Sequence, residues 1–276
     1  MLMRHTCFIF VFLLLSIIMH AAQVDTLEVY SACMYKSVKV LVISPDSSKM
    51  EKKCKSFPVV YLLHGYSGGY RSWLAMKPNL PDLAEFYQMI FVCPDAKNSW
   101  YWDAPLKPEW KYETFISKEL VPYIDANYST RPFPEGRAIT GFSMGGHGAF
   151  RFACRYTDIW GAVGSTSGGL DVRPFPQGWE MDQLLGDIAM HPEVWDEYTA
   201  ITQIDRIKKK DLAIIFDCGK EDVFLKVNLA MHECLWKKGI EHDFIIREGG
   251  HTHEYWQNAI DYQLLFFHKF FQKIVK

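Results

Sequence analysis

Short apolar runs recur along the chain and predict a series of β-strands. "KSVKVLVIS" (36–44) alternates apolar and polar residues in its first half, which is the pattern of a half-exposed strand. "FPVVYLLHG" (57–65) is continuously apolar, which predicts a strand covered on both faces. Further apolar runs predict strands at 89–95, 137–143, 161–167, 212–219 and 242–248.

Helical spacing of apolar residues occupies the stretches between these runs. It predicts helices at 113–128, 145–157, 222–239 and 253–274, and the third of them ends in lysines and a glycine, a C-terminal signal. Strands that alternate with helices favour an α/β fold with a mostly parallel central sheet and helices on both faces.

One segment, 170–210, breaks this alternation. It contains Pro174, Pro176, Trp179 and Trp195 and is too long to be a simple connection. We interpret it as an inserted lid or pocket wall. The sequence shows no internal repeat, low-complexity tract or linker, so residues 23–276 are predicted to form a single domain.

The N-terminal residues have a different composition. Arg4 precedes an almost wholly apolar run (7–19), and the small residues Ala21 and Ala22 follow it. This layout predicts a signal peptide over residues 1–22, and the apolar run is short for a transmembrane helix. We therefore expect an exported protein, periplasmic or extracellular, with no stable membrane span after cleavage. An uncleaved anchor is the alternative, because His20 is an unusual residue at the −3 position.

Composition and charge narrow the function further. The chain of 276 residues is 49% apolar and 15% aromatic, and its formal net charge of −2 gives no reason to expect a nucleic-acid partner. Export permits disulfides, and Cys33 with Cys54 is the one pair that we consider. The remaining cysteines after the predicted cleavage site are expected to be mostly buried thiols, since Cys93 and Cys218 end apolar runs.

"RAITGFSMGGHGAF" (137–150) places Ser143 between a predicted strand and a predicted helix, which is the setting of a nucleophile elbow. Such a sharp turn needs tiny neighbours, and Gly141 and Gly145 provide them. The start of the helix also directs free N–H groups toward a developing oxyanion. A flexible glycine loop is the alternative interpretation.

A serine nucleophile needs a base, and the base needs an orienting acid. Both occur after Ser143 in the expected chain order: Asp222 follows the predicted strand at 212–219, and His251 follows the one at 242–248. The carboxyl ends of parallel strands gather the sites of open α/β sheets. Asp217 and Glu221 are the alternatives to Asp222.

His253 is the alternative to His251. The pair His251-x-His253 also suggests a metal site, but no further ligand cluster accompanies it, so neither a metal nor a cofactor is expected. His147, inside the predicted helix after the elbow, is interpreted as a packed or solvated histidine.

An oxyanion hole needs two N–H donors aimed at one oxygen. The backbone of Met144, directly after the serine, is the first candidate. The second is the backbone of Tyr66 in "LLHGYSGGY" (62–70), where a strand ends in a glycine-rich turn. An ordinary strand-to-loop turn at His64 and Gly65 is the alternative.

Together, "VVYLLHGYSGGYRSW", "CPDAKNSWYWDAP", "ETFISKELVPYID", "GRAITGFSMGGHGAF", "DCGKEDVF" and "GGHTHEYW" resemble the motifs of the esterase D-like group of α/β-hydrolases. The group includes feruloyl and acetylxylan esterases of carbohydrate esterase family one, S-formylglutathione hydrolases and mycobacterial mycolyltransferases. The resemblance runs from about Val29 to the C-terminus. It implies an α/β-hydrolase fold with the nucleophile, acid and base at Ser143, Asp222 and His251, and oxyanion donors at Tyr66 and Met144.

Substrate preference is less defined by these motifs. Trp100, Tyr101 and Trp179 are candidate pocket residues that could stack on a phenolic acyl group or a sugar, with core packing as the alternative. His253 is a fourth candidate, and it departs from the aromatic residue that many relatives have there.

We therefore expect a secreted serine carboxylic-ester hydrolase that removes feruloyl or acetyl groups from plant polysaccharide. The expected partner is an acylated carbohydrate or a small phenolic ester, and the oligomeric state is left open. The alternatives are a general short-chain carboxylesterase, an S-formylglutathione hydrolase-like thioesterase, which export disfavours, an acyltransferase, or a degenerate hydrolase-fold binding protein.

Overall fold

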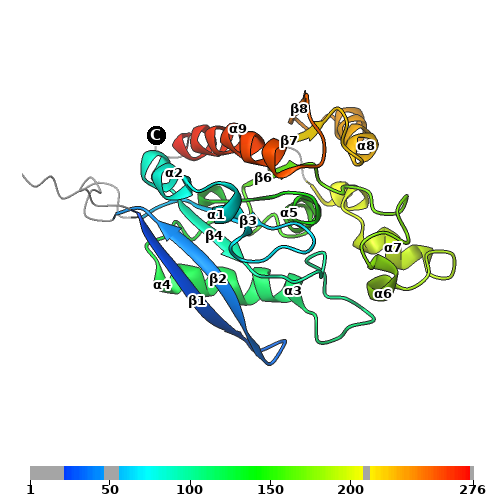
Figure 1. Ribbon diagram of the computed structural model, residues 1–276, viewed down its shortest axis with the longest axis horizontal. Coiled ribbons are helices and arrows are strands. Elements are labelled where there is room, and N and C mark those ends of the chain that lie inside the picture. The colour runs from blue at the N-terminus through cyan, green and yellow to red at the C-terminus, as the bar shows by residue number, and fades with distance from the viewer. Residues whose placement is uncertain (1–21, 47–55, 208–211, 274–276) are drawn as a thin grey trace, which may run out of the picture.

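A mostly parallel sheet forms the centre of the molecule. The computed structural model describes residues 22–46, 56–207 and 212–273 (Figure 1). In spatial order the eight strands are β1 (Gln23–Ser31), β2 (Lys36–Ser44), β4 (Ile90–Pro94), β3 (Val59–Leu63), β5 (Arg137–Gly141), β6 (Ala162–Thr166), β7 (Ala213–Gly219) and β8 (Asp243–Arg247). The pairs β1–β2 and β2–β4 are antiparallel, and the remaining pairs are parallel.

Every apolar run predicted as a strand forms one. Strands β3, β4, β5 and β6 are buried along their whole length, as expected of strands covered on both faces. Strand β1 was not predicted. It is the outermost strand on its side, and only Val29 and Ser31 of its nine residues are buried, so its apolar signal is weak.

The predicted helices are present, with one local irregularity. They correspond to α3 (Tyr112–Thr114) with η2 (Phe115–Leu120) and α4 (Val121–Asn127), to α5 (Met144–Arg155), to α8 (Leu225–Lys237) and to α9 (His253–Gln272). The stretch η2 is π-helical and directly precedes α4, whose first turn contains Pro122. Proline has no N–H to donate to the preceding turn, which fits a widened helix at this point.

Helices cover the sheet on both faces and enclose two apolar cores. One core lies under α1 (Ser72–Met76), α2 (Leu80–Tyr87) and α9. The larger core lies under the helices of 112–127, α5, α8 and the inserted segment. Figure 1 shows α2 and α9 along one side of the sheet and α3 and α4 along the other. Helices α1 and α2 were not predicted, because each is short.

The inserted segment is packed against the body of the protein. It forms α6 (Met181–Leu185), α7 (Pro192–Tyr198) and a 3-10 helix (Ile201–Arg206). Trp195 is fully buried and donates to Gly186 O at 2.9 Å, and the Tyr198 hydroxyl donates to Asp103 O at 2.7 Å. The first bond lies within the segment and the second joins it to the body, and its buried residues Met181, Leu184 and Trp195 belong to the larger core.

Two predictions lie wholly or partly outside the described residues. The predicted signal peptide lies outside them except for Ala22, and Cys54 lies outside them as well. Cys33 has a free thiol, as do the buried residues Cys93, Cys154 and Cys218 and the half-buried Cys234.

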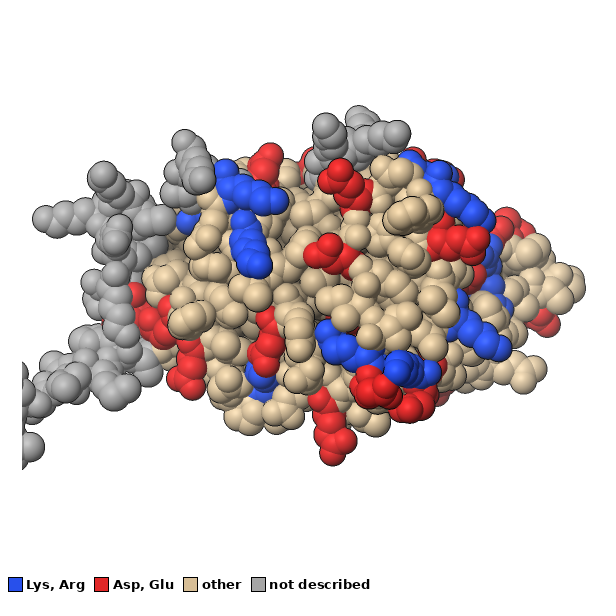
Figure 2. All heavy atoms as spheres, turned by 90° about the horizontal axis from the view of Figure 1, so that it is seen from above, with Lys and Arg blue, Asp and Glu red and all other residues tan. Residues whose placement is uncertain are grey.

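The surface carries mixed charge. Figure 2 looks onto the side of the molecule that carries α9 and shows basic and acidic side chains interspersed among uncharged ones. Across the residues that the structure describes, no helix has the length and apolar character needed to cross a bilayer.

Candidate active site

Ser143 occupies a strained turn between β5 and α5. Its backbone has φ 55° and ψ −120°, a region that costs a residue with a side chain about 1–3 kcal/mol. The turn lies against the end of β3, since a Cβ on Gly145 would lie 2.3 Å from Leu63 O, and it is itself tight, since a Cβ on Gly141 would lie 2.5 Å from Gly145 C. The small residues of the motif therefore allow a close backbone approach, as predicted for an elbow.

The structure brings Ser143, His251 and Asp222 together from three separate segments. His251 Nε2 lies 2.9 Å from Ser143 Oγ, and His251 Nδ1 lies 3.0 and 3.1 Å from the two carboxylate oxygens of Asp222. The Asp222 side chain is fully buried and the His251 side chain is 23% exposed. Because Asp222 accepts from Nδ1–H, His251 Nε2 is left to accept the proton of Ser143.

The loop around Asp222 holds its carboxylate in place. Phe224 N donates to Asp222 Oδ1 at 2.8 Å, and Asp222 N donates to Gly219 O at 3.2 Å. Glu221, one of the two alternatives to Asp222, is exposed. Asp217, the other, is fully buried and bonds to Thr166 and Gln263.

His253, the alternative to His251, begins α9 and is exposed. Its ring lies 5.3 Å from that of Trp256, which in turn lies 4.8 Å from the His251 ring. Trp256 therefore contacts both histidine rings and connects His253 to His251.

The two candidate oxyanion donors are free to bind a ligand. Among the described residues, neither Tyr66 N nor Met144 N donates a hydrogen bond to another group. His64 fixes the loop before Tyr66, since its Nδ1–H donates to Gly65 O at 2.7 Å and its Nε2 accepts from Ala96 N at 2.9 Å. Burial lowers the pKa of His64, which favours the neutral ring that this pattern requires.

Comparison with known proteins decides the family. The Esterase family model matches residues 31–267, which includes the elbow, both candidate oxyanion donors and the Asp222 and His251 loops. The chain belongs to the Esterase family.

Individual relatives of this esterase agree on the type of reaction. It is 26% identical to an acetyl esterase of Caldicellulosiruptor saccharolyticus over 84% of this chain and 92% of the relative. It is 24% identical to the S-formylglutathione hydrolase of Bos taurus over 61% of this chain and 65% of the relative. A solved ferulic acid esterase superposes with a TM-score of 0.77 and 28% identity, covering 91% of this chain and all of that one.

These findings confirm the esterase D-like resemblance, the α/β-hydrolase fold and a serine esterase that hydrolyses carboxylic esters. The degenerate binding protein considered as an alternative is thereby set aside.

Two of the predicted pocket residues of the esterase lie in its core instead. Trp100 and Tyr101 are each 1% exposed, and both have positive φ values, 55° and 63°. The Tyr101 hydroxyl donates to His64 O at 3.0 Å, and the Trp100 ring lies 5.6 Å from the ring of Trp102. The core-packing alternative holds for both, because this turn directs their rings into the protein.

An aromatic wall does lie beside the triad, in which Phe175 and Trp179 are half-buried and Phe224 is buried. The ring of the predicted pocket residue Trp179 is 5.0 Å from that of Phe224, which is 5.2 Å from the His251 ring. Phe175 lies 5.9 Å from Trp179 and completes the wall. We did not predict Phe175 or Phe224. Phe224 follows Asp222 by two residues, a position that could have suggested contact with the base.

His147 is buried and takes no part in this group. Its Nδ1–H donates to Gly169 O at 2.8 Å and its Nε2 accepts from Trp102 Nε1 at 3.0 Å. Burial lowers the pKa of His147 to about 4, so the ring is neutral near neutral pH. Of the two possibilities for His147, a packed or a solvated histidine, the structure shows the packed one.

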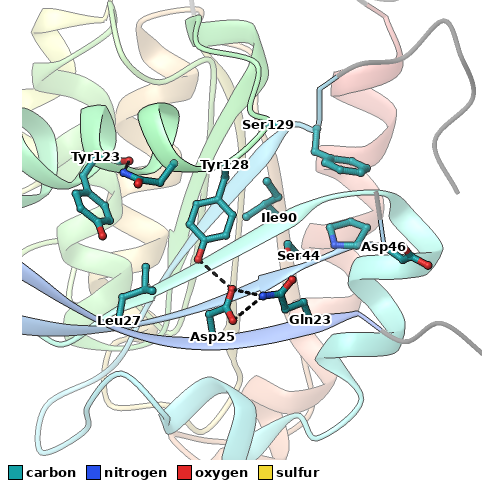
Figure 3. A pocket seen from close by; sticks show the side chains of 12 residues that line it. Gln23, Asp25, Leu27, Ser44, Asp46, Ile90, Tyr123, Tyr128 and Ser129 are labelled. Atoms are coloured by element: carbon teal, nitrogen blue, oxygen red, sulfur yellow. Dashed lines mark hydrogen bonds between the residues drawn. The ribbon is translucent and has the colours of Figure 1, made fainter. Parts of the chain in front are cut away.

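Within residues 22–46, 56–207 and 212–273, no group of three or more His, Cys, Asp or Glu side chains could hold a metal ion. A cavity of about 590 Å³ lies between β1, β2 and α4, where Tyr128 and Gln23 both bond to Asp25 (Figure 3). Its lining includes Ile90, the first residue of β4, so it lies toward the amino ends of the parallel strands, away from the predicted site.

Proposed function

We propose that Ser143, His251 and Asp222 are the catalytic triad of this esterase. The observation that carries the proposal is the chain of contacts from Ser143 Oγ through the His251 ring to Asp222, with all three distances between 2.9 and 3.1 Å. A nucleophile bonded to a base, which is itself oriented by a buried acid, is the arrangement required for acyl transfer through a serine.

The reaction proceeds in two halves. His251 Nε2 takes the Ser143 proton as Oγ attacks the ester carbonyl, and Asp222 holds the ring in position. Tyr66 N–H and Met144 N–H donate to the oxyanion of the tetrahedral intermediate. His251 then gives its proton to the departing alkoxide, which leaves as the alcohol. Water attacks the acyl-enzyme by the same steps, releasing the acid and restoring Ser143.

The proposed substrates are feruloyl or acetyl esters of plant polysaccharide. Similarity to an acetyl esterase and to a ferulic acid esterase supports this substrate class. The half-buried rings of Phe175 and Trp179, which pack on the buried Phe224 beside His251, support an acyl group with an aromatic ring, because offset or edge-to-face ring contacts are favourable. Export, implied by the predicted signal peptide, would give the enzyme access to such polymers.

A substrate panel tests this proposal. The values of kcat/KM for methyl ferulate, acetylated xylan, tributyrin and S-formylglutathione are measured under one set of conditions. We expect methyl ferulate or acetylated xylan to be preferred. A preference for tributyrin would indicate a general short-chain esterase, and a preference for S-formylglutathione would overturn the assignment to exported carbohydrate esters. Transfer of the acyl group to an added alcohol in place of water would indicate an acyltransferase.

A further inference from the structure

Asp217 is a buried carboxylate on β7, five positions before Asp222, that the mechanism above does not use. Its side chain is 1% exposed, yet it contacts polar groups from three other elements. Oδ1 accepts from Thr166 Oγ1 at 2.6 Å and forms an ion pair with Arg247 Nη2 at 3.2 Å, and Oδ2 accepts from Gln263 Nε2 at 2.8 Å.

The contact with Thr166 leads to the nucleophile. Thr166 ends β6, and its carbonyl oxygen accepts from Ser143 N at 3.0 Å. The neighbouring Ser167 N donates to the Asp217 carbonyl at 2.8 Å. Both the side chain and the backbone of Asp217 therefore hold the end of β6, which in turn holds the backbone of the elbow.

The contact with Arg247 leads to the acid and the base. Arg247 is the last residue of β8, four positions before His251, and lies opposite Gly219 in the β7–β8 register. Its carbonyl accepts from Lys220 N at 2.9 Å, and Gly249 O accepts from Glu221 N at 3.1 Å. These two backbone hydrogen bonds, one of them to Arg247 itself, join the loop of Asp222 to the loop of His251.

The contact with Gln263 reaches α9, the helix that begins two residues after His251. Arg247 reinforces this connection, because its guanidinium lies 4.4 Å from the ring centre of Tyr262 and 5.4 Å from that of Tyr255, both on α9. The Asp217 carboxylate on β7 therefore contacts β6, β8 and α9, the elements next to the three triad residues.

The contacts of Asp217 match an ionised carboxylate, since its two oxygens accept hydrogen bonds and a guanidinium supplies the counter-charge. Burial raises the pKa of Asp217, and the Arg247 guanidinium together with the two donated hydrogen bonds opposes that rise. An amide at the same place would offer one accepting oxygen instead of two and would leave Arg247 without its counter-charge. Removing one member of a buried pair leaves an uncompensated charge, which the surrounding strands must move to solvate.

We propose that Asp217 is a positioning residue that sets the placement of Ser143, Asp222 and His251 relative to one another. The inference rests on the triad assigned under the proposed function. Asp217 acts through Thr166, Arg247 and Gln263 and does not touch the substrate. Its contribution is to kcat, because misplacing reacting groups by a fraction of an ångström slows the chemical step more than it weakens substrate binding.

The experiment compares Asp217→Asn with Glu113→Gln, a matched control. Glu113 is another deeply buried carboxylate, and its partners Arg151, Arg155 and Tyr156 lie in the second half of α5 or just after it, away from Ser143. Unfolding temperature, kcat and KM for p-nitrophenyl acetate, and the rate of labelling by a fluorophosphonate are measured for each, well below the unfolding temperature. We expect both variants to be less stable. Asp217→Asn should lose roughly tenfold or more in kcat and in labelling rate, with KM changed less than about twofold, whereas Glu113→Gln should retain both rates within about twofold.

A second variant covers the case in which Asp217→Asn does not fold. Thr166→Val keeps the shape of the side chain and removes one hydrogen bond, and it should lower kcat and the labelling rate by roughly threefold or more. If Asp217→Asn folds and has wild-type rates, the proposal is overturned. If Asp217→Asn does not fold, wild-type rates in Thr166→Val overturn it. Ser143→Ala separates the two claims: if it retains turnover the triad itself is wrong, and if it is inactive while Asp217→Asn is fully active only the positioning role fails.

Discussion

The Tyr66 hydroxyl donates a 2.6 Å hydrogen bond to the carboxylate of Glu180, which lies 114 residues further along the chain. Tyr66 is one of the two proposed oxyanion donors, and Glu180 directly follows Trp179 of the aromatic wall. Both Trp179 and Glu180 have positive φ values, 49° and 57°. This hydrogen bond joins the inserted segment to the loop after β3, at two residues of the segment whose positive φ values are uncommon for residues with a side chain.

We expect Tyr66→Phe to lower kcat/KM by roughly twofold to tenfold, because it removes this bond and keeps the backbone N–H. Burial and the Glu180 bond raise the pKa of Tyr66 to about 12, so the hydroxyl stays a donor throughout the usual assay range. Steady-state kinetics on methyl ferulate measure the effect. Tyr35→Phe, at a tyrosine that is 84% exposed, serves as the control. Equal kinetics for both variants would show that the inserted segment does not depend on this contact.

Gly145→Ala is expected to destabilise the protein strongly. The new Cβ would lie 2.3 Å from Leu63 O and 2.7 Å from His64 O, and these are backbone atoms that cannot move aside without shifting β3 and its loop. We expect a loss of about 2–4 kcal/mol in the free energy of unfolding, measured by urea denaturation. At Gly178 the nearest atom to a new Cβ is 3.3 Å away, so Gly178→Ala should change stability by less than about 1 kcal/mol. Similar stabilities for the two variants would contradict a close approach at the elbow.

The sequence was most informative where one local signal determines the structure. Continuous apolar runs predicted the buried strands, and the glycines around Ser143 indicated a tight turn with the geometry that the structure shows. Strand β1 and helices α1 and α2 were missed, because an edge strand and short helices bury too few residues to leave a clear pattern.

Side-chain direction was the harder problem. Trp100 and Tyr101 lie within "CPDAKNSWYWDAP", a motif of the family, which suggested a place beside the substrate, but two consecutive residues with positive φ turn them into the core. Phe175 lies far from any motif and reaches the His251 side only through the path of the inserted segment. The role that we propose for Asp217 was likewise invisible in the sequence, because its partners come from three separate elements.

The protein should become less stable as pH falls below about 6.5, because His147 is buried in its neutral form. The pKa of this residue is about 4 in the folded protein and about 6.5 in an unfolded chain, so the unfolded state binds a proton that the folded state does not. The stability that comes from keeping the ring neutral is present above pH 6.5 and is lost as pH falls from about 6.5 to 4, by up to roughly 3 kcal/mol. Urea unfolding at pH 7.5 and pH 4.5 gives the slope for the wild type. His147→Gln does not titrate, and its slope should be shallower; equal slopes would contradict a buried neutral histidine as the source.

Substitution of Ser143 separates chemistry from backbone strain. Ser143→Ala removes the nucleophile and should abolish turnover of p-nitrophenyl acetate, while the fold and the φ of 55° are retained. Ser143→Gly also removes the nucleophile, but glycine adopts a positive φ without the steric penalty of a Cβ. We therefore expect both variants to be inactive and Ser143→Gly to be more stable than Ser143→Ala by about 1 kcal/mol in urea unfolding, less the entropy that glycine loses on folding. Residual turnover by Ser143→Ala would overturn the nucleophile assignment. A less stable Ser143→Gly would instead show that the elbow is not strained in solution, whatever the kinetics.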